Sequence, residues 1–182
     1  MPYEPGDEKN MRYEIVDGIR YHMQPSPVVS HQVLNTTLYT ALHSSCQLDG
    51  IVMIAPMDVH LGKGNVVQPD LILIRNDNAS VTVRKWIYGV PDLLVEILAP
   101  SGGAHDKIRK KELYARFCVP EYWIVDPVHD TIDLFKLDES GQHYRLERTY
   151  GRGDKLLSGR LPCIQLDLER VFAAIDRFRD TE

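Results

Sequence analysis

The sequence predicts an α/β protein in which a mixed β-sheet is flanked by a few helices and preceded by an N-terminal β-hairpin. Three observations favour this fold class. Residues 71–74 and 93–95 are apolar runs without polar alternation, which is typical of strands covered on both faces. Segments with helical spacing interrupt the strands. The length of 182 residues is enough for one domain with a buried core.

The first half of the chain predicts short strands and one long helix. Residues 1–11 are polar and rich in turn formers, so we expect a flexible arm before a single domain over residues 12–182. Asp17-Gly18 is typical of a tight hairpin turn, and Gly50 follows the apolar helical spacing of the long helix. The predicted elements are strands at 13–16, 19–23, 51–54 and 57–61, and a helix at 28–48.

The second half predicts a central strand, a helix, a meander and a last helix. Residues 75–88 have little periodicity and indicate a surface excursion. Asp167 has the residue type and position of an N-cap for the last helix. The predicted elements are strands at 92–98, 121–125, 131–137, 143–149 and 161–166, and helices at 104–117 and 168–179.

The composition excludes several classes of protein. A net charge of −5 argues against nucleic-acid binding through bulk positive charge, and leaves open a local basic surface. Cys46, Cys118 and Cys163 lie far apart in no paired spacing, so we expect buried, reduced thiols and neither a disulfide framework nor a zinc site. Without a signal-peptide pattern or a long apolar run, we expect a cytoplasmic protein with no membrane span.

Two carboxylates stand inside the apolar runs. Asp70 begins the first run and Glu96 lies near the end of the second. A buried acid must be paired, protonated or bound to a metal, because an isolated buried carboxylate costs several kcal/mol. If the strands are neighbours, the two acids converge at one end of the sheet. That arrangement favours a divalent-cation site for hydrolysis.

The lysines of the helix predicted at 104–117 point in different directions, one toward the core and the others toward solvent. On a helical wheel, the apolar stripe spans an arc of roughly 100°, and Lys110 falls within it. The stripe contains Asp106, Lys110, Leu113, Tyr114 and Phe117, whereas Lys107, Arg109, Lys111 and Arg116 fall outside it, toward solvent. An exposed ion pair between Asp106 and Lys110 would explain the pattern. Alternatively, Lys110 reaches the acids and keeps them ionised.

Several segments together resemble the Uma-two family, bacterial proteins assigned to the PD-(D/E)XK restriction-endonuclease-like superfamily. The resemblance covers roughly residues 12–135 and depends on the combination of motifs. These are Tyr-Glu-Ile-Val-Asp-Gly (13–18), Ser-Pro (26–27), His31, Gln-Pro-Asp (68–70), Glu-Ile-Leu-Ala-Pro-Ser (96–101), Asp106-x3-Lys110-x3-Tyr114 and Val-Pro-Glu-Tyr-Trp-Ile-Val-Asp-Pro (119–127).

The resemblance implies a restriction-endonuclease-like core and an endonuclease that uses Mg²⁺ or Mn²⁺ on nucleic acid, with DNA favoured. It implies Asp70, Glu96 and the backbone carbonyl of Ile97 as metal ligands. The lysine of this superfamily stands two residues after the glutamate, a position that is Leu98 here. We expect Lys110 to take its place as the third catalytic residue. Loss of catalysis in a nucleic-acid-binding or homodimeric interaction module is the alternative.

Further residues complete the prediction. Glu14 is expected as an early acid beside the metal or as a surface carboxylate, and His31 as a site-facing or a backbone-bonded histidine. Asp106 and Tyr114 are expected to surround the site. The residues expected to contact nucleic acid are Lys107 and Lys111, with Arg84 and Lys85 in a loop whose aromatic neighbours, Trp86 and Tyr88, stack on bases or cover the core. A homodimer is expected by analogy, because two strand cuts need two sites.

Overall fold

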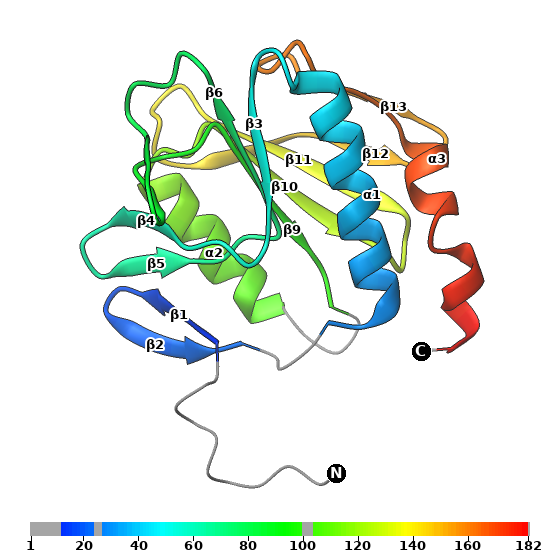
Figure 1. Cartoon of the computed structure of the whole chain (residues 1–182), viewed down its shortest axis with the longest axis horizontal. Coiled ribbons are helices and arrows are strands. Elements are labelled where there is room, and N and C mark those ends of the chain that lie inside the picture. Colours follow the sequence, from blue (N-terminus) through cyan, green and yellow to red (C-terminus); the bar gives the residue numbers. More distant parts are fainter. Residues whose placement is uncertain (1–11, 24–26, 100–103, 182) are drawn as a thin grey trace, which may run out of the picture.

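The computed structural model describes residues 12–23, 27–99 and 104–181, and within α2 and η2 it leaves the side chains of residues 104–107 and 180–181 undescribed. In the described chain, two six-stranded sheets and one two-stranded sheet are combined with few helices (Figure 1). The predicted class, α/β with mixed sheets and an N-terminal hairpin, is confirmed. The single mixed sheet that we expected is two separate sheets.

The central sheet follows the order β12-β11-β10-β9-β6-β3. Its β9 and β10 are parallel neighbours, and its other described pairs are antiparallel. Its strands are β3 (Gly50–Ile54), β6 (Leu71–Arg75), β9 (Leu93–Ile97), β10 (Glu121–Asp126), β11 (Thr131–Leu137) and β12 (Tyr144–Gly151). The parallel pair needs a crossover, which α2 (Ala104–Arg116) provides.

The second sheet follows the order β2-β1-β5-β4-β8-β7 and assembles segments that are far apart in the chain. Its strands are β1 (Tyr13–Val16), β2 (Ile19–His22), β4 (Val59–Gly62), β5 (Asn65–Val67), β7 (Thr82–Val83) and β8 (Ile87–Tyr88). The predicted Asp17-Gly18 turn joins β1 to β2, and both residues have positive φ angles, 52° and 79°. The predicted surface excursion at 75–88 therefore contains β7 and β8.

Helices cover both faces of the central sheet. The helix α1 (Val29–Cys46) lies on one face with α3 (Leu168–Ala173) and the 3-10 helix η2 (Asp176–Thr181), and α2 lies on the other face (Figure 1). In β9, Leu93 and Val95 contact the α1-side core, whereas Leu94 contacts the α2-side core. This alternation between two cores explains why the strand sequence is apolar throughout. Glu96 lies two residues after Leu94, on the same face of β9, and therefore faces α2.

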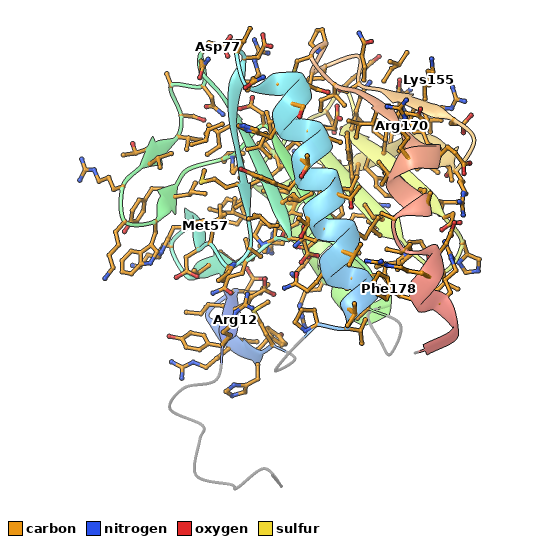
Figure 2. The ribbon with its side chains drawn as sticks, turned by 45° about the vertical axis from the view of Figure 1, so that its right-hand side comes forward. Arg12, Met57, Asp77, Lys155, Arg170 and Phe178 are labelled. Carbon is orange, nitrogen blue, oxygen red and sulfur yellow. A yellow bond between two sulfur atoms is a disulfide. The ribbon has the colours of Figure 1, made fainter. Side chains whose placement is uncertain are left out.

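Packing around α1 is continuous. Leu34, Leu38 and Leu42 repeat every four residues and are at most 1% exposed. Side chains fill the space between this helix and the sheet (Figure 2).

Among the described residues, no helix combines the length and apolarity that a membrane crossing requires.

The C-terminal region differs from the prediction. The expected helix at 168–179 is divided into α3 and η2, and Asp167 stands at the N-cap position without a capping hydrogen bond from its side chain. The strand expected at 161–166 is the shorter β14 (Gln165–Asp167), which pairs with β13 (Lys155–Leu157). Because β13 and β14 have only three residues each, their alternation is too short to indicate a strand.

The cysteine prediction is wrong. Cys46, at the end of α1, and Cys163, before β14, form a disulfide with their Cα atoms 5.1 Å apart, and Cys118 is exposed instead of buried. The two partners are separated by 117 residues. Sequence spacing carries no information about a pair that only the folded topology brings together.

We expect protein purified without reductant and unfolded in guanidinium to show one titratable thiol per chain, that of Cys118, and three after reduction. The reason is that the disulfide removes Cys46 and Cys163 from the count. Ellman titration measures it, and Cys118→Ser should reduce the unreduced count to zero. Three reactive thiols before reduction would contradict the pairing.

A second buried carboxylate lies outside the predicted site. Glu121 is 0% exposed and accepts hydrogen bonds from Trp123 Nε1 and Ser158 Oγ, each at 2.7 Å. Burial raises the pKa of Glu121, and these two hydrogen bonds offset only part of the increase.

The raised pKa of Glu121 predicts a pH-dependent stability. A group of this kind stabilises the fold fully below its ordinary pKa of 4.5, and the contribution is lost as pH rises through the folded value. The difference in unfolding free energy between the natural chain and Glu121→Gln should therefore fall as pH rises above 4.5. Urea unfolding across pH measures this difference, and a constant difference would refute the prediction.

Candidate active site

The strands that carry the two predicted carboxylates are neighbours. β6 and β9 are antiparallel, with Leu71 opposite Val95, so Asp70 and Glu96 follow at the same end of the pair. Asp70 Oδ2 accepts a hydrogen bond of 2.7 Å from the amide of Ile97. The main-chain oxygen of Asp70 accepts another, of 2.9 Å, from Ala55 on the β3 side. Asp70 is thereby fixed to the strands on both sides.

Lys110 points inward from α2, as the helical wheel predicts. It is 4% exposed, and its Nζ lies 2.9 Å from Glu96 Oε1 and 2.9 Å from Glu14 Oε1. The exposed ion pair with Asp106 would leave Lys110 near solvent, so it does not account for this burial. The side chain of Asp106 itself lies outside those that the structure describes.

Glu14 comes from β1 of the second sheet and is 3% exposed, so it is not the surface carboxylate of the alternative prediction. Its Oε1 also accepts a 2.7 Å hydrogen bond from the amide of Gln68. Strand β1 places Glu14 on its inward face, where alternate residues of the hairpin pack toward α2. The second sheet, the central sheet and α2 therefore meet at Lys110.

Tyr114 lies one turn after Lys110 on α2 and donates a 2.7 Å hydrogen bond from its hydroxyl to Glu96 Oε1. Burial, together with the nearby carboxylates, raises the pKa of Tyr114 well above its ordinary value, so the hydroxyl stays protonated and donates.

The acidity of Glu96 is also strongly perturbed. Burial raises the pKa of Glu96 to about 8, Lys110 opposes this increase, and the charges of Asp70 and Glu14 add to it. Three carboxylates, Glu14, Asp70 and Glu96, therefore interact in this region with Lys110, the only lysine that is buried among the described residues. Such an excess of buried negative charge favours a proton or an additional cation.

His31 approaches Asp70 from the other layer of the molecule. It lies in the first turn of α1, and its Nε2 is 3.5 Å from Asp70 Oδ2. Burial lowers the pKa of His31, but the hydrogen bond and charge of Asp70, with smaller contributions from the Ile97 backbone and the charge of Glu96, outweigh it, and the net pKa is raised. His31 thus contacts Asp70 and also hydrogen-bonds the backbone of Ile97, so it has features of both predicted alternatives.

Gln68 was not assigned a role from the sequence. Besides its amide bond to Glu14, its side-chain Nε2 donates to Asp58 Oδ1 at 2.6 Å, and its Oε1 accepts from Arg12 Nη2 at 2.6 Å. Its place in the Gln-Pro-Asp motif, two residues before Asp70, is the sequence signal for this role.

The predicted basic patch on α2 is only partly available. Lys111 is half-buried with its Nζ 3.8 Å from the centre of the Phe135 ring, and burial lowers its pKa. The guanidinium of Arg109 lies 3.7 Å from the centre of the Tyr21 ring, and Arg116 pairs with Asp17. The prediction that Arg109 and Lys111 face solvent is therefore wrong, because aromatic rings from the two sheets hold them.

The remaining predicted contacts lie elsewhere. The side chain of Lys107 lies outside those described. Arg84 and Lys85 are exposed in the loop between β7 and β8. Ile97 contributes its amide to Asp70, and Leu98 packs partly buried in the α2-side core. Within the described part of the chain, no three His, Cys, Asp or Glu side chains are grouped so as to hold a metal ion.

Comparison with known proteins relates this α/β architecture to a family described as "Putative restriction endonuclease". The chain resembles the crystal structure of a protein from Anabaena variabilis described as a "putative nuclease", with a TM-score of 0.70, 13% sequence identity and 90% of each chain covered. At that identity the likeness shows a shared α/β fold. The chain itself belongs to the Uma2 (Uma-two) family, whose model, described as "Putative restriction endonuclease", matches residues 1–169. No curated protein matches the chain.

We expect Lys110→Met to lower the free energy of unfolding by about 3–5 kcal/mol, because it leaves Glu14 and Glu96 buried without their shared cation. Arg116→Gln, which removes an exposed pair on the same helix, should cost no more than about 1 kcal/mol. Urea unfolding at pH 7 measures both. Equal costs would mean that the buried contact does not support the fold.

Proposed function

We propose that this protein is a metal-dependent endonuclease that hydrolyses phosphodiester bonds of nucleic acid, with DNA as the favoured substrate. The observation that carries the proposal is the placement of Lys110, a buried amine 2.9 Å from Glu96 and 2.9 Å from Glu14, beside Asp70 on the neighbouring strand. Lys110 contacts two acids, Glu14 and Glu96, and the charge of a third, Asp70, acts on Glu96. An excess of acid is useful where a cation binds.

The chemistry of the donors fits Mg²⁺ or Mn²⁺, which prefer oxygen ligands. We propose Asp70, Glu96 and the carbonyl of Ile97 as ligands. Both side-chain contacts of Asp70 use Oδ2 and both of Glu96 use Oε1, so the second oxygen of each carboxylate takes no part in these contacts. A bound divalent cation supplies Lewis-acid polarisation of the phosphate and a more acidic water.

The protein's own residues provide charge and orientation. Lys110 neutralises charge that develops on the phosphate or orients the attacking water. Glu14 and Tyr114 act as positioning residues, since the first holds the Lys110 amine and the second holds Glu96 Oε1. His31 positions Asp70 from α1. With Leu98 at the usual lysine position, Lys110 is the amine that contacts Glu96.

One observation favours a different proposal. Lys110 is 4% exposed and engaged by two acids, which is also what a site devoted to stability would show. In that case the protein is a catalytically inactive relative that binds nucleic acid or forms a homodimeric interaction module.

Plasmid DNA incubated with Mg²⁺ or Mn²⁺ tests the proposal. Asp70→Asn and Glu96→Gln should lose cleavage by about 10²–10³-fold, because each removes a charged ligand. Lys110→Gln should lose about as much. Glu112→Gln, an exposed acid on the same helix, is the matched control and should cleave normally.

Two further measurements separate the proposals. Metal should raise the thermal midpoint of the natural chain and of Glu112→Gln, but of neither Asp70→Asn nor Glu96→Gln. No cleavage of plasmid, linear duplex, single-stranded DNA or RNA with either metal would favour the inactive relative. Light scattering should show a dimer if both strands are cut in one encounter.

A further inference from the structure

The outer face of the second sheet, which points away from α2, exposes aromatic side chains. Ile87 is buried toward α2, so the next residue of β8, Tyr88, points outward and is 38% exposed. The register places His60 of β4 beside Tyr88 on the same face. Trp86, at the tip of the β7–β8 hairpin, is 36% exposed. Trp86 and Tyr88 belong to neither of the two core clusters of the described residues.

The three rings form one surface. The rings of His60 and Tyr88 are stacked with centroids 4.7 Å apart, and that of Trp86 lies 5.5 Å from His60. Lys85 Nζ is 4.7 Å from the centre of the Trp86 ring, and Arg84 is exposed beside it. The other edge of the sheet repeats this pairing, with the Arg20 guanidinium 4.0 Å from the centre of the Tyr13 ring.

The charge of this face is opposite to that of the whole chain. The net charge of the protein is −5. In the described strands of the second sheet, the only carboxylate is Glu14, which is buried on the inner face. At the sheet's margins, Asp17 pairs with Arg116, and Asp58 accepts a hydrogen bond from Gln68. The outer face therefore presents cations and rings to a ligand.

The aromatic surface is connected to the candidate active site by hydrogen bonds. The amide of Ile87, next to Trp86, donates to the main-chain oxygen of Asp58 at 3.0 Å. Asp58 Oδ1 accepts from the side chain of Gln68, whose amide binds Glu14, the partner of Lys110. The starts of β1, β4 and β8 share this edge of the sheet with the end of β5. Arg12 and Met57 are labelled near it in Figure 2.

We propose that this outer face binds the unpaired nucleotides of a single-stranded nucleic-acid segment and leads them to the Asp70–Glu96 edge. Bases stack on Trp86 and Tyr88, and phosphates lie against Arg84 and Lys85. The inference rests on the proposed function and adds its substrate class. A duplex offers phosphates but hides the faces of its bases, so exposed rings beside cations match a single strand better.

Fluorescence anisotropy with a labelled oligothymidylate of about 12 nucleotides tests the proposal in EDTA, where cleavage is absent. Trp86→Ala and Tyr88→Ala should each weaken binding by about tenfold, the loss of one stacked base. Trp86→Phe should restore most of it because the ring is kept. Val83→Ala, which trims an exposed apolar residue of the same hairpin, is the control. Arg84→Gln and Lys85→Gln should weaken binding and reduce its salt dependence.

Tryptophan fluorescence and a comparison of single-stranded with duplex ligands provide a second test of the proposed binding surface. Oligothymidylate should quench Trp86 emission in the natural chain, a change that Trp86→Ala removes, because Trp123 is fully buried. A uridylate oligomer should bind similarly, and a duplex or inorganic polyphosphate more weakly. Duplex binding equal to single-strand binding, or no effect of Trp86→Ala, would overturn the proposal.

The binding assay tests the aromatic surface and the cleavage assay tests the proposed hydrolysis, so a negative result in one does not decide the other. Binding without cleavage by any metal leaves this surface standing and removes the proposed hydrolysis. Cleavage without oligothymidylate binding does the reverse.

Discussion

The contact of Lys110 with Glu14 and Glu96 is the interaction on which the rest of the structure depends. It joins three elements that the chain order keeps apart, namely β1 in the second sheet, β9 in the central sheet and α2 between them. A buried amine is stable only when its charge is matched, and the amine in turn stabilises the charged forms of both acids. The relative placement of the two sheets is therefore fixed by polar atoms as well as by the apolar cluster around α2.

The parts of the fold that could be predicted were those encoded locally. Asp17-Gly18 carries its own turn conformation, the strand of Glu96 is apolar because it is covered twice, and the direction of Lys110 follows from helical spacing. The separate second sheet was not predictable in this way, because its hairpins are joined by two long-range pairings, Ile15 with Val66 and Val59 with Ile87. The same is true of Cys46, whose partner is 117 positions away.

The errors on α2 have a different cause. A helical wheel gives the direction of the bond from Cα to Cβ, but a long cationic side chain can bend back along the surface and place its charge on a ring. Arg109 and Lys111 do this against Tyr21 and Phe135. Gln68 was missed because an uncharged side chain carries no obvious signal of chemistry, although it links Glu14 to Asp58 and Arg12.

The hydrogen bond between Asp70 and the amide of Ile97 has a consequence for how this region can vary. The last matched residues of β6 and β9 are Leu71 and Val95, and past them a side-chain oxygen takes the place that a main-chain carbonyl would have in a longer ladder. An apolar replacement at position 70 would leave the amide of Ile97 without its hydrogen-bond acceptor and weaken the connection between β6 and β9 at this end. One residue thus serves both the proposed chemistry and the connection between two strands. A relative that has lost catalysis would still need an aspartate at this position for its fold.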